Sequence, residues 1–214
     1  MKIGIQIVLW VASIFFAYKI YDSINGPIKF NEEKNVRYAK VINRLKDIRT
    51  AQIAHRDVKG VFSNNFDSLI KFIDEGQFTL IEKRDSSFLE YDRTYRIDML
   101  REIIVIDTLG TVTVKDSLFK NTDRYKNLKQ IKIGDLIVPI TLKTSSIVRN
   151  ETKVSTFQCT IDKNLLLSDL DQDLVASENK VEGIDKINGD QIILGSLDEA
   201  SVTGNWPKKY GSNE

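Results

Sequence analysis

Residues 3–24, IGIQIVLWVASIFFAYKIYDSI, form a long apolar stretch that decides the architecture of the chain. Between Lys2 and Lys19 the only ionisable side chain is the phenol of Tyr18. A helix over residues 3–24 would be about 33 Å long at a rise of about 1.5 Å per residue, and a hydrocarbon core is about 30 Å thick. The stretch therefore predicts a membrane-spanning helix, and residues 1–24 are expected to form a transmembrane anchor.

A cleaved signal peptide and a buried soluble helix are the alternatives to this anchor. A signal peptide should end in a small-x-small site, and the best candidate, ending at Ala17, has bulky Phe15 at its −3 position. An uncleaved anchor is favoured, because Lys19 can extend its stem toward the headgroups and tyrosines suit the interface. The residues expected to contact lipid are Ile3, Trp10, Phe15, Phe16, Tyr18 and Lys19.

The charges on the two sides of the apolar stretch give conflicting indications of the orientation of the anchor. Lys2 precedes the apolar stretch and Lys19, Lys29 and Lys34 follow it, so a strict count of basic residues leans against export of the body. A very short N-terminal tail, however, usually stays inside while a long domain is translocated. We expect a single-pass protein whose C-terminal domain lies outside the cytoplasm.

The composition argues against several classes of function. The chain has 31 basic and 30 acidic residues, so its net charge gives no indication of nucleic-acid binding. His55 and Cys159 are its only histidine and cysteine, which leaves almost no ligands for zinc and no pair for cysteine–histidine catalysis. Asp169, Asp171 and Asp173 alternate as at the start of a calcium loop, but its glycine and glutamate positions hold other residues. We predict no catalytic residue, cofactor or metal, and a non-enzymatic protein.

The segment after the anchor predicts a turn and then two helices. Asn25-Gly26-Pro27 favours a break or a kink in the membrane helix, and residues 25–30 are expected to form a juxtamembrane turn. Asn31 is a candidate N-cap for a helix that runs to about Val58, with one apolar stripe at steps of three and four. Gly60 should end it, and Asn64 or Asn65 should cap a short helix over residues 66–74 that Gly76 ends.

Charge is unevenly distributed along the chain. Residues 29–60 hold nine lysines or arginines and four acids, whereas residues 165–205 hold two and nine. Such an asymmetry can steer a protein partner or a second copy, although two solvated faces would give the same counts. The basic side of the long helix is the candidate partner-facing surface, with Arg37, Lys40, Arg44 and Arg49.

From Gln77 onward the pattern changes to period two. Strands are expected at 78–81, 87–97, 102–107 and 111–114, with residues 102–107 as a central strand and a turn at Leu109-Gly110. Further strands are expected over 129–133, 136–142, 146–148, 156–161 and 191–195, a short helix over 174–180, and an irregular segment over 116–127. Cys159 should share a buried face with Phe157 and Ile161.

These patterns predict an α+β fold: an N-terminal transmembrane helix, then a long amphipathic helix and a short helix packed on an antiparallel sheet, then a mostly β C-terminal region. The expected divisions are an α+β module over 31–120, a mostly β module over 129–205 and a tail over 206–214 in which Trp206 docks. One continuous α+β domain is the alternative. Triplets of aspartate, serine or threonine, and leucine resemble an O-glycosylation signal of exported Bacteroidota proteins, which implies modification at Ser68, Thr108 and Ser117.

Two family resemblances extend these expectations. A membrane helix, the segment AQIAHRDVKGVF at 51–62 and the short helix with Phe66, Leu69 and Ile70 resemble the start of pilins and pseudopilins, although the prepilin peptidase site and the usual glutamate are absent from residues 1–24. This resemblance implies a filament or assembly subunit.

Residues 23–30, 38–47, 114–125 and 204–207 resemble uncharacterised single-span envelope proteins of flavobacteria and related Bacteroidota. That resemblance implies an inner-membrane protein facing the periplasm. The leading hypothesis is a protein-binding subunit of a cell-envelope complex for secretion or transport, with membrane lipid and other envelope proteins as partners and a second copy as a further candidate. A filament subunit and an anchored hydrolase or carbohydrate-binding domain are the alternatives.

Overall fold

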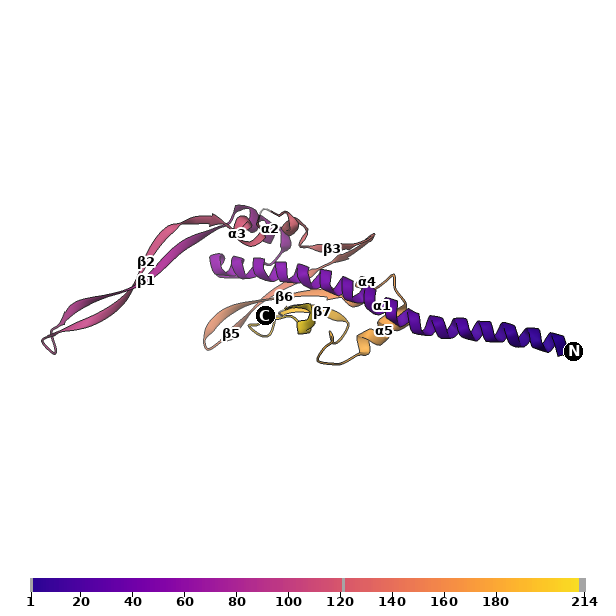
Figure 1. Cartoon of the computed structure of the whole chain (residues 1–214). Coiled ribbons are helices and arrows are strands. Elements are labelled where there is room, and N and C mark those ends of the chain that lie inside the picture. Colours follow the sequence, from indigo (N-terminus) through magenta and orange to yellow (C-terminus); the bar gives the residue numbers. More distant parts are fainter. Residues whose placement is uncertain (1, 121, 212–214) are drawn as a thin grey trace. The chain divides into compact units, whose positions relative to one another are not determined.

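The computed structural model describes residues 2–120 and 122–211 and shows the α+β fold that the sequence predicts. A long N-terminal apolar helix is followed by short helices, antiparallel sheets and a C-terminal region built mostly of strands (Figure 1). The helices are α1 (Lys2–Lys59), α2 (Phe66–Glu75), α3 (Val114–Phe119), α4 (Lys163–Leu166) and α5 (Gln172–Lys180), with 3₁₀ turns η1 (Arg124–Asn127) and η2 (Lys208–Tyr210).

Within the described residues, the strands form three separate antiparallel sheets. β1 (Gln77–Asp92) pairs with β2 (Ile97–Thr113), and β3 (Gln130–Ile133) pairs with β4 (Leu136–Pro139). β6 (Thr152–Asp162) is the central strand of the third sheet, between β5 (Thr141–Arg149) and β7 (Gln191–Ser196). Pro139 ends β4 in a two-stranded sheet, where each strand has an unpaired edge that tolerates a residue without an amide donor.

Helix α1 is continuous through Gly26 and Pro27, so the predicted break and the turn over residues 25–30 are wrong, and Asn31 is not an N-cap. Pro27 removes one amide donor, but long helical segments continue on both sides of it, and helix propagation is cooperative. Two asparagine side chains donate to backbone carbonyls around the proline. Asn25 Nδ2 donates to Tyr21 O at 3.0 Å, and Asn31 Nδ2 donates to Pro27 O at 2.8 Å.

The predicted ends of α1 and α2 are confirmed. Gly60 follows α1 with φ 78°, a left-handed conformation that glycine adopts without strain, and its amide donates to Arg56 O at 2.7 Å. Asn65 caps α2, because its side-chain oxygen accepts from the Ser68 amide at 2.7 Å. Gly76 is the C-cap of α2, and its amide donates to Phe72 O.

The chain divides into two compact units, and α1 contributes to both of them. Unit 1 contains residues 1–49 and 127–214, and unit 2 contains residues 50–126. This division differs from the expected module over 31–120, because the N-terminal part of the long helix belongs with the C-terminal strands.

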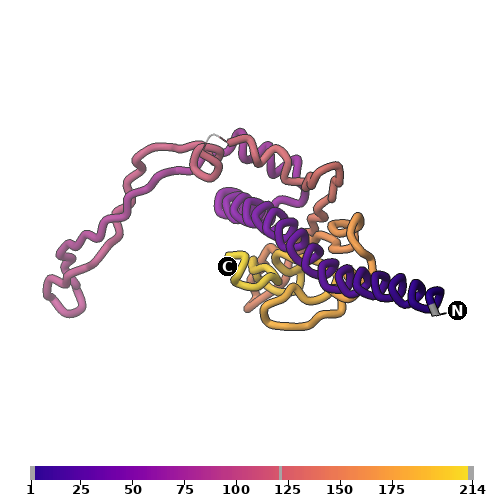
Figure 2. The backbone as a smooth tube through the Cα atoms, turned by 45° about the vertical axis from the view of Figure 1, so that its right-hand side comes forward, coloured from indigo at the N-terminus to yellow at the C-terminus, as the bar shows by residue number. Residues whose placement is uncertain are grey.

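The core of unit 1 combines the apolar stripe of α1 with the β5-β6-β7 sheet. Side chains at steps of three and four on α1 are fully buried: Tyr38, Val41, Ile42, Leu45 and Ile48. On β6, Phe157, Cys159 and Ile161 are buried on one face, as predicted, and burial raises the pKa of the Cys159 thiol to about 12. The segment before the C-terminus also lies against α1 (Figure 2): the Tyr210 hydroxyl donates to Asn35 Oδ1, and Lys46 Nζ donates to Tyr210 O.

Unit 2 has a smaller core between α2 and the segment that follows β2. Leu69, Phe72 and Ile73 of α2 are buried, and so are Val114 and Phe119 of α3. Tyr125 is also buried, and its hydroxyl donates to Asp74. Residues 116–127, expected to be irregular, therefore include a helix and a 3₁₀ turn that complete this core.

Candidate membrane segment and protein-interaction surface

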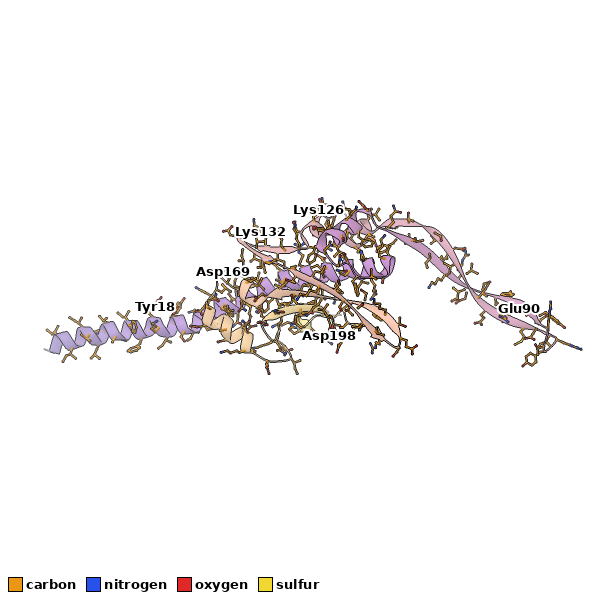
Figure 3. All side chains as sticks on the ribbon, turned by 180° about the vertical axis from the view of Figure 1, so that it is seen from behind. Tyr18, Glu90, Lys126, Lys132, Asp169 and Asp198 are labelled. Carbon is orange, nitrogen blue, oxygen red and sulfur yellow. The ribbon has the colours of Figure 1, made fainter. Side chains whose placement is uncertain are left out.

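The N-terminal part of α1 is long and apolar enough to cross a membrane. Trp10, Phe15 and Phe16 are exposed, and so are Ile3, Tyr18 and Lys19. Figure 3 shows this part of α1 around Tyr18 with its side chains projecting outward. The predicted lipid-contacting residues thus all lie on a largely apolar helical surface that the other described residues leave exposed.

The four basic residues predicted to face a partner differ in their surroundings. Lys40 is exposed, whereas Arg44 and Arg49 are half-buried. Arg37 is only 5% exposed, so it does not fit the predicted partner-facing surface. The physical reason is an internal site: Arg37 binds Asp169 through both terminal nitrogens, donates from Nη1 to Leu166 O at 2.9 Å, and pairs with Glu33 at 2.9 Å.

Asp169 and Asp171, two of the alternating aspartates, have structural roles. The hydrogen bond from Arg37 holds the pKa of Asp169 below its usual range. Asp171 caps α5, because its Oδ1 accepts from the amides of Asp173 and Leu174 at 2.9 Å and 3.2 Å. Among residues 2–120 and 122–211, no group of three or more histidines, cysteines or acids is placed to hold a metal ion.

A second set of buried charges joins α1 to α5 and to the segment before β7. Lys34 Nζ pairs with Glu178 Oε2 at 2.8 Å, and both side chains are about nine-tenths buried. Lys163 is fully buried, and its Nζ donates to Ile187 O and Gly189 O at 2.5 Å each. Burial lowers the pKa of Lys163 and raises that of nearby Tyr38. Sequence reasoning missed this cluster, because lysine and glutamate are rarely buried unless paired.

Replacing Arg37 with alanine is expected to lower the free energy of unfolding of unit 1 by about 2 kcal/mol. The variant loses the two charge-assisted hydrogen bonds from the guanidinium to Asp169 and leaves Leu166 O without its donor. Because Asp169 is half-exposed, water can solvate its carboxylate, which limits the loss of stability. Urea titration of the full chain in a non-denaturing detergent, followed by hydrogen exchange in β6, measures the change. Lys40→Ala is the matched control and should stay within about 0.5 kcal/mol of the parent; equal effects of the two would contradict the assigned role of Arg37.

The β1–β2 ribbon carries most of the large exposed apolar side chains among the described residues of unit 2. Its strands pair from Gln77–Thr113 to Asp92–Ile97, with one bulge beside Leu80 and Ile81. The predicted turn at Leu109-Gly110 is wrong, because the bulge leaves Leu109 unpaired and β2 continues to Thr113. The predicted central strand at 102–107 is a strand, but its sheet contains only β1 and β2.

The pairing of the ribbon leaves its aliphatic run without apolar cross-strand neighbours. Ile103, Ile104, Val105 and Ile106 of β2 lie opposite Ser86, Asp85, Arg84 and Lys83 of β1, in that order. Their exposed fractions are 44%, 63%, 36% and 57%. A central strand normally gains most of its stability from apolar neighbours on both sides.

Apolar side chains also line the outer part of the ribbon. The exposed ones include Phe88, Leu89, Tyr91, Tyr95, Ile97, Met99 and Leu100. Figure 3 shows side chains projecting from both faces of the ribbon, with Glu90 near its far end. Alternate residues of each strand turn their backbone amides and carbonyls away from the partner strand, so both long edges can accept another strand. An isolated two-stranded hairpin is marginally stable in water.

The described residues form a surface hollow in each unit. One hollow of about 510 Å³ lies beside His55, Lys59, Lys71 and Glu75 of unit 2. Its histidine is already engaged, because His55 Nδ1 lies 2.7 Å from Val61 O and the ring packs edge-on against Phe72. A second hollow of about 580 Å³, in unit 1, lies between α1 near Phe30 and the Asp169–Asp171 segment.

The three candidate O-glycosylation residues are exposed and lie on regular elements. Ser68 is in the first turn of α2, Thr108 is on β2, and Ser117 is on α3. Modification at these hydroxyls stays a prediction. Comparison with known proteins adds no family: no family model matches the chain, and neither the curated proteins nor the solved structures include a significant match.

Proposed function

We propose that this chain is a non-enzymatic, membrane-anchored subunit of a cell-envelope complex that binds other envelope proteins through the β1–β2 ribbon. Residues 3–24 hold it in the inner membrane as a single span, and the body lies in the periplasm. The observation that carries the proposal is the ribbon, whose apolar side chains are exposed on both faces and whose sheet has only two strands. Large exposed apolar surfaces mark sites of protein–protein contact.

A site-specific cross-linking experiment in the native host tests this function. A photo-reactive phenylalanine analogue replaces Leu100 in the ribbon, and the control carries it at exposed Asp198 in unit 1. We expect covalent adducts of defined mass from position 100 and none from position 198, because only the ribbon engages a protein. Adducts at equal yield from both positions, or none from any ribbon position, would contradict the proposal.

A shortened ribbon provides the matching loss-of-binding variant. Residues 84–105 are replaced by Asn-Gly, which joins the paired residues Lys83 and Ile106 through a favourable hairpin turn. This variant should retain hydrogen-exchange protection in β6 of unit 1 while losing the envelope complexes that we expect the parent chain to show on native gels. Retention of those complexes would assign binding to another surface.

A pilin-like filament or assembly subunit is the second candidate, and the unbroken α1 favours it. A long helix whose first part is exposed and whose next part packs on a sheet supports that arrangement. Copies in such a filament would contact each other through the apolar residues of 3–24. Cross-links between copies at Trp10 with none from the ribbon would support this candidate over the first.

A further inference from the structure

The two strands of the ribbon differ in how well their outer edges are protected. β1 carries an uninterrupted polar run over residues 82–87, Glu-Lys-Arg-Asp-Ser-Ser, and charged side chains are a common device that blocks edge-to-edge pairing. β2 carries Ile103-Ile104-Val105-Ile106 at the same level of the ribbon. The edge of β2 therefore has the composition of a strand that is paired on both sides.

We infer that β2 pairs with β2 of a second copy of this chain, in antiparallel orientation and centred on Ile104, to form a sheet in the order β1-β2-β2-β1. The inference rests on the proposed function of the ribbon as a protein-binding element and names the partner of one part of it, the outer edge of β2. In this register Ile104 lies opposite Ile104 of the second copy, and Ile103 lies opposite its Val105. Ile103, Ile104 and Val105 then have the aliphatic cross-strand neighbours that β1 does not provide, whereas Ile106 lies opposite Glu102 of the second copy.

Charge complementarity selects this register and this partner. Antiparallel pairing centred on Ile104 places Arg101 of each copy opposite Asp107 of the other. Within one chain Asp107 already binds Arg84, and Arg101 Nε lies 2.5 Å from Glu90 Oε2. Charges of alternating sign therefore follow one another across the four strands. They are Arg84 and Asp107 of one copy, and then Arg101 and Glu90 of the other.

Neighbouring registers lack this match. A shift of one residue in one direction places Glu102 opposite Asp107 of the other copy, and directly opposed like charges destabilise a sheet. A shift in the other direction places Arg101 opposite Ile106. Because the sequence of β2 is complementary to itself, a second copy satisfies the edge without any other protein.

A charge-exchange experiment tests the inference with the full-length chain in lipid nanodiscs large enough for two copies. Arg101→Asp places two aspartates, at positions 101 and 107, opposite each other at both ends of the interface. Asp107→Arg places two arginines opposite each other at the same two positions. Each variant alone should lose self-association at least about tenfold, measured by energy transfer between labelled copies. Mixing the two variants restores both opposite-charge pairs, so energy transfer should return to at least half the parental level.

The mixture also separates a lost interface from a misfolded ribbon, since two misfolded chains would not rescue each other. Ile104→Lys should abolish the dimer, because it places two ammonium groups together at the centre of the interface. Ser87→Lys is its control, with the same charge on the same face of the ribbon but on β1. The inference is overturned if both lysine variants behave alike, if the mixture stays monomeric, or if the parent forms only large aggregates.

This design distinguishes failure of the inference from failure of the proposed function. Adducts of the position-100 cross-linker with a different protein, together with a parent that stays monomeric in nanodiscs, would overturn self-pairing and leave the ribbon as a protein-binding element. Absence of any adduct in the native host would overturn the proposed function as well.

Discussion

Replacing Lys163 with alanine is expected to lower the free energy of unfolding of unit 1 by about 3–5 kcal/mol. Lys163 is fully buried at the start of α4, and its ammonium is the donor to both Ile187 O and Gly189 O. The alanine variant leaves two carbonyls without this donor and removes the packing of the lysine stem. An unsatisfied buried carbonyl such as Ile187 O costs about 1–3 kcal/mol, whereas Gly189 is exposed, so water can replace the ammonium at its carbonyl.

Lys163→Met separates the two contributions, because methionine retains most of the stem and lacks the donors. It should lose about 2 kcal/mol, less than alanine, since it also removes the cost of burying a charge. Urea titration in detergent measures both variants, and hydrogen exchange at residues 187–190 reports whether that segment detaches. An alanine variant within about 1 kcal/mol of the parent would show that the ammonium contributes no net stability.

Replacing Trp206 with alanine is expected to cost about 3–5 kcal/mol, as is usual for deletion of a buried aromatic ring. Trp206 is 2% exposed, and the residue before it ties the chain to β7. The Asn205 amide donates to Ile193 O, and Asn205 Oδ1 accepts from the Ile193 amide. Loss of the ring should therefore loosen β7 along with the C-terminal segment, which hydrogen exchange in β7 can measure.

Gly204 provides an independent test of the same packing. A Cβ atom at Gly204 would lie 2.1–2.4 Å from ring atoms of Trp206, so the ring occupies the space that a side chain would need. Gly204→Ala should be destabilising by about 2 kcal/mol or more, whereas Gly183→Ala, where the nearest side-chain atom is 3.9 Å away, should have little effect. If Trp206→Ala and Gly204→Ala both leave β7 unchanged, the proposed role of the ring is wrong.

The sequence predicted the local elements whose signals are short-range. Asn65 caps the start of α2 and Gly76 caps its end, as predicted. The helix predicted at 174–180 lies within α5, and Cys159 shares its buried face with Phe157 and Ile161. In each case the cap, the period or the alternation acts over a few residues. The long apolar stretch at 3–24 could also be recognised from the sequence, because a helix of that length matches the thickness of a hydrocarbon core.

The features that sequence reasoning missed depend on distant partners. Pro27 predicted a break, but the helical segments on either side outweigh one lost hydrogen bond. Arg37 had the pattern of an exposed basic residue, and its burial follows from Asp169, which lies far along the chain. The run at 103–106 has the composition of a central strand, yet β1 lies on one side of it and the opposite edge of β2 is the one that we infer to pair with a second copy.

The absence of a loop between residues 24 and 30 of α1 has a mechanical consequence for unit 1. The exposed apolar turns within residues 3–24 and the buried turns at Tyr38 and Val41 belong to one helix, which extends about 1.5 Å per residue without interruption. A bilayer that is thinner or thicker than the apolar length changes the tilt of such a helix. In the single-span arrangement that we propose, unit 1 must rotate with the helix through a similar angle, so bilayer thickness would set the inclination of unit 1.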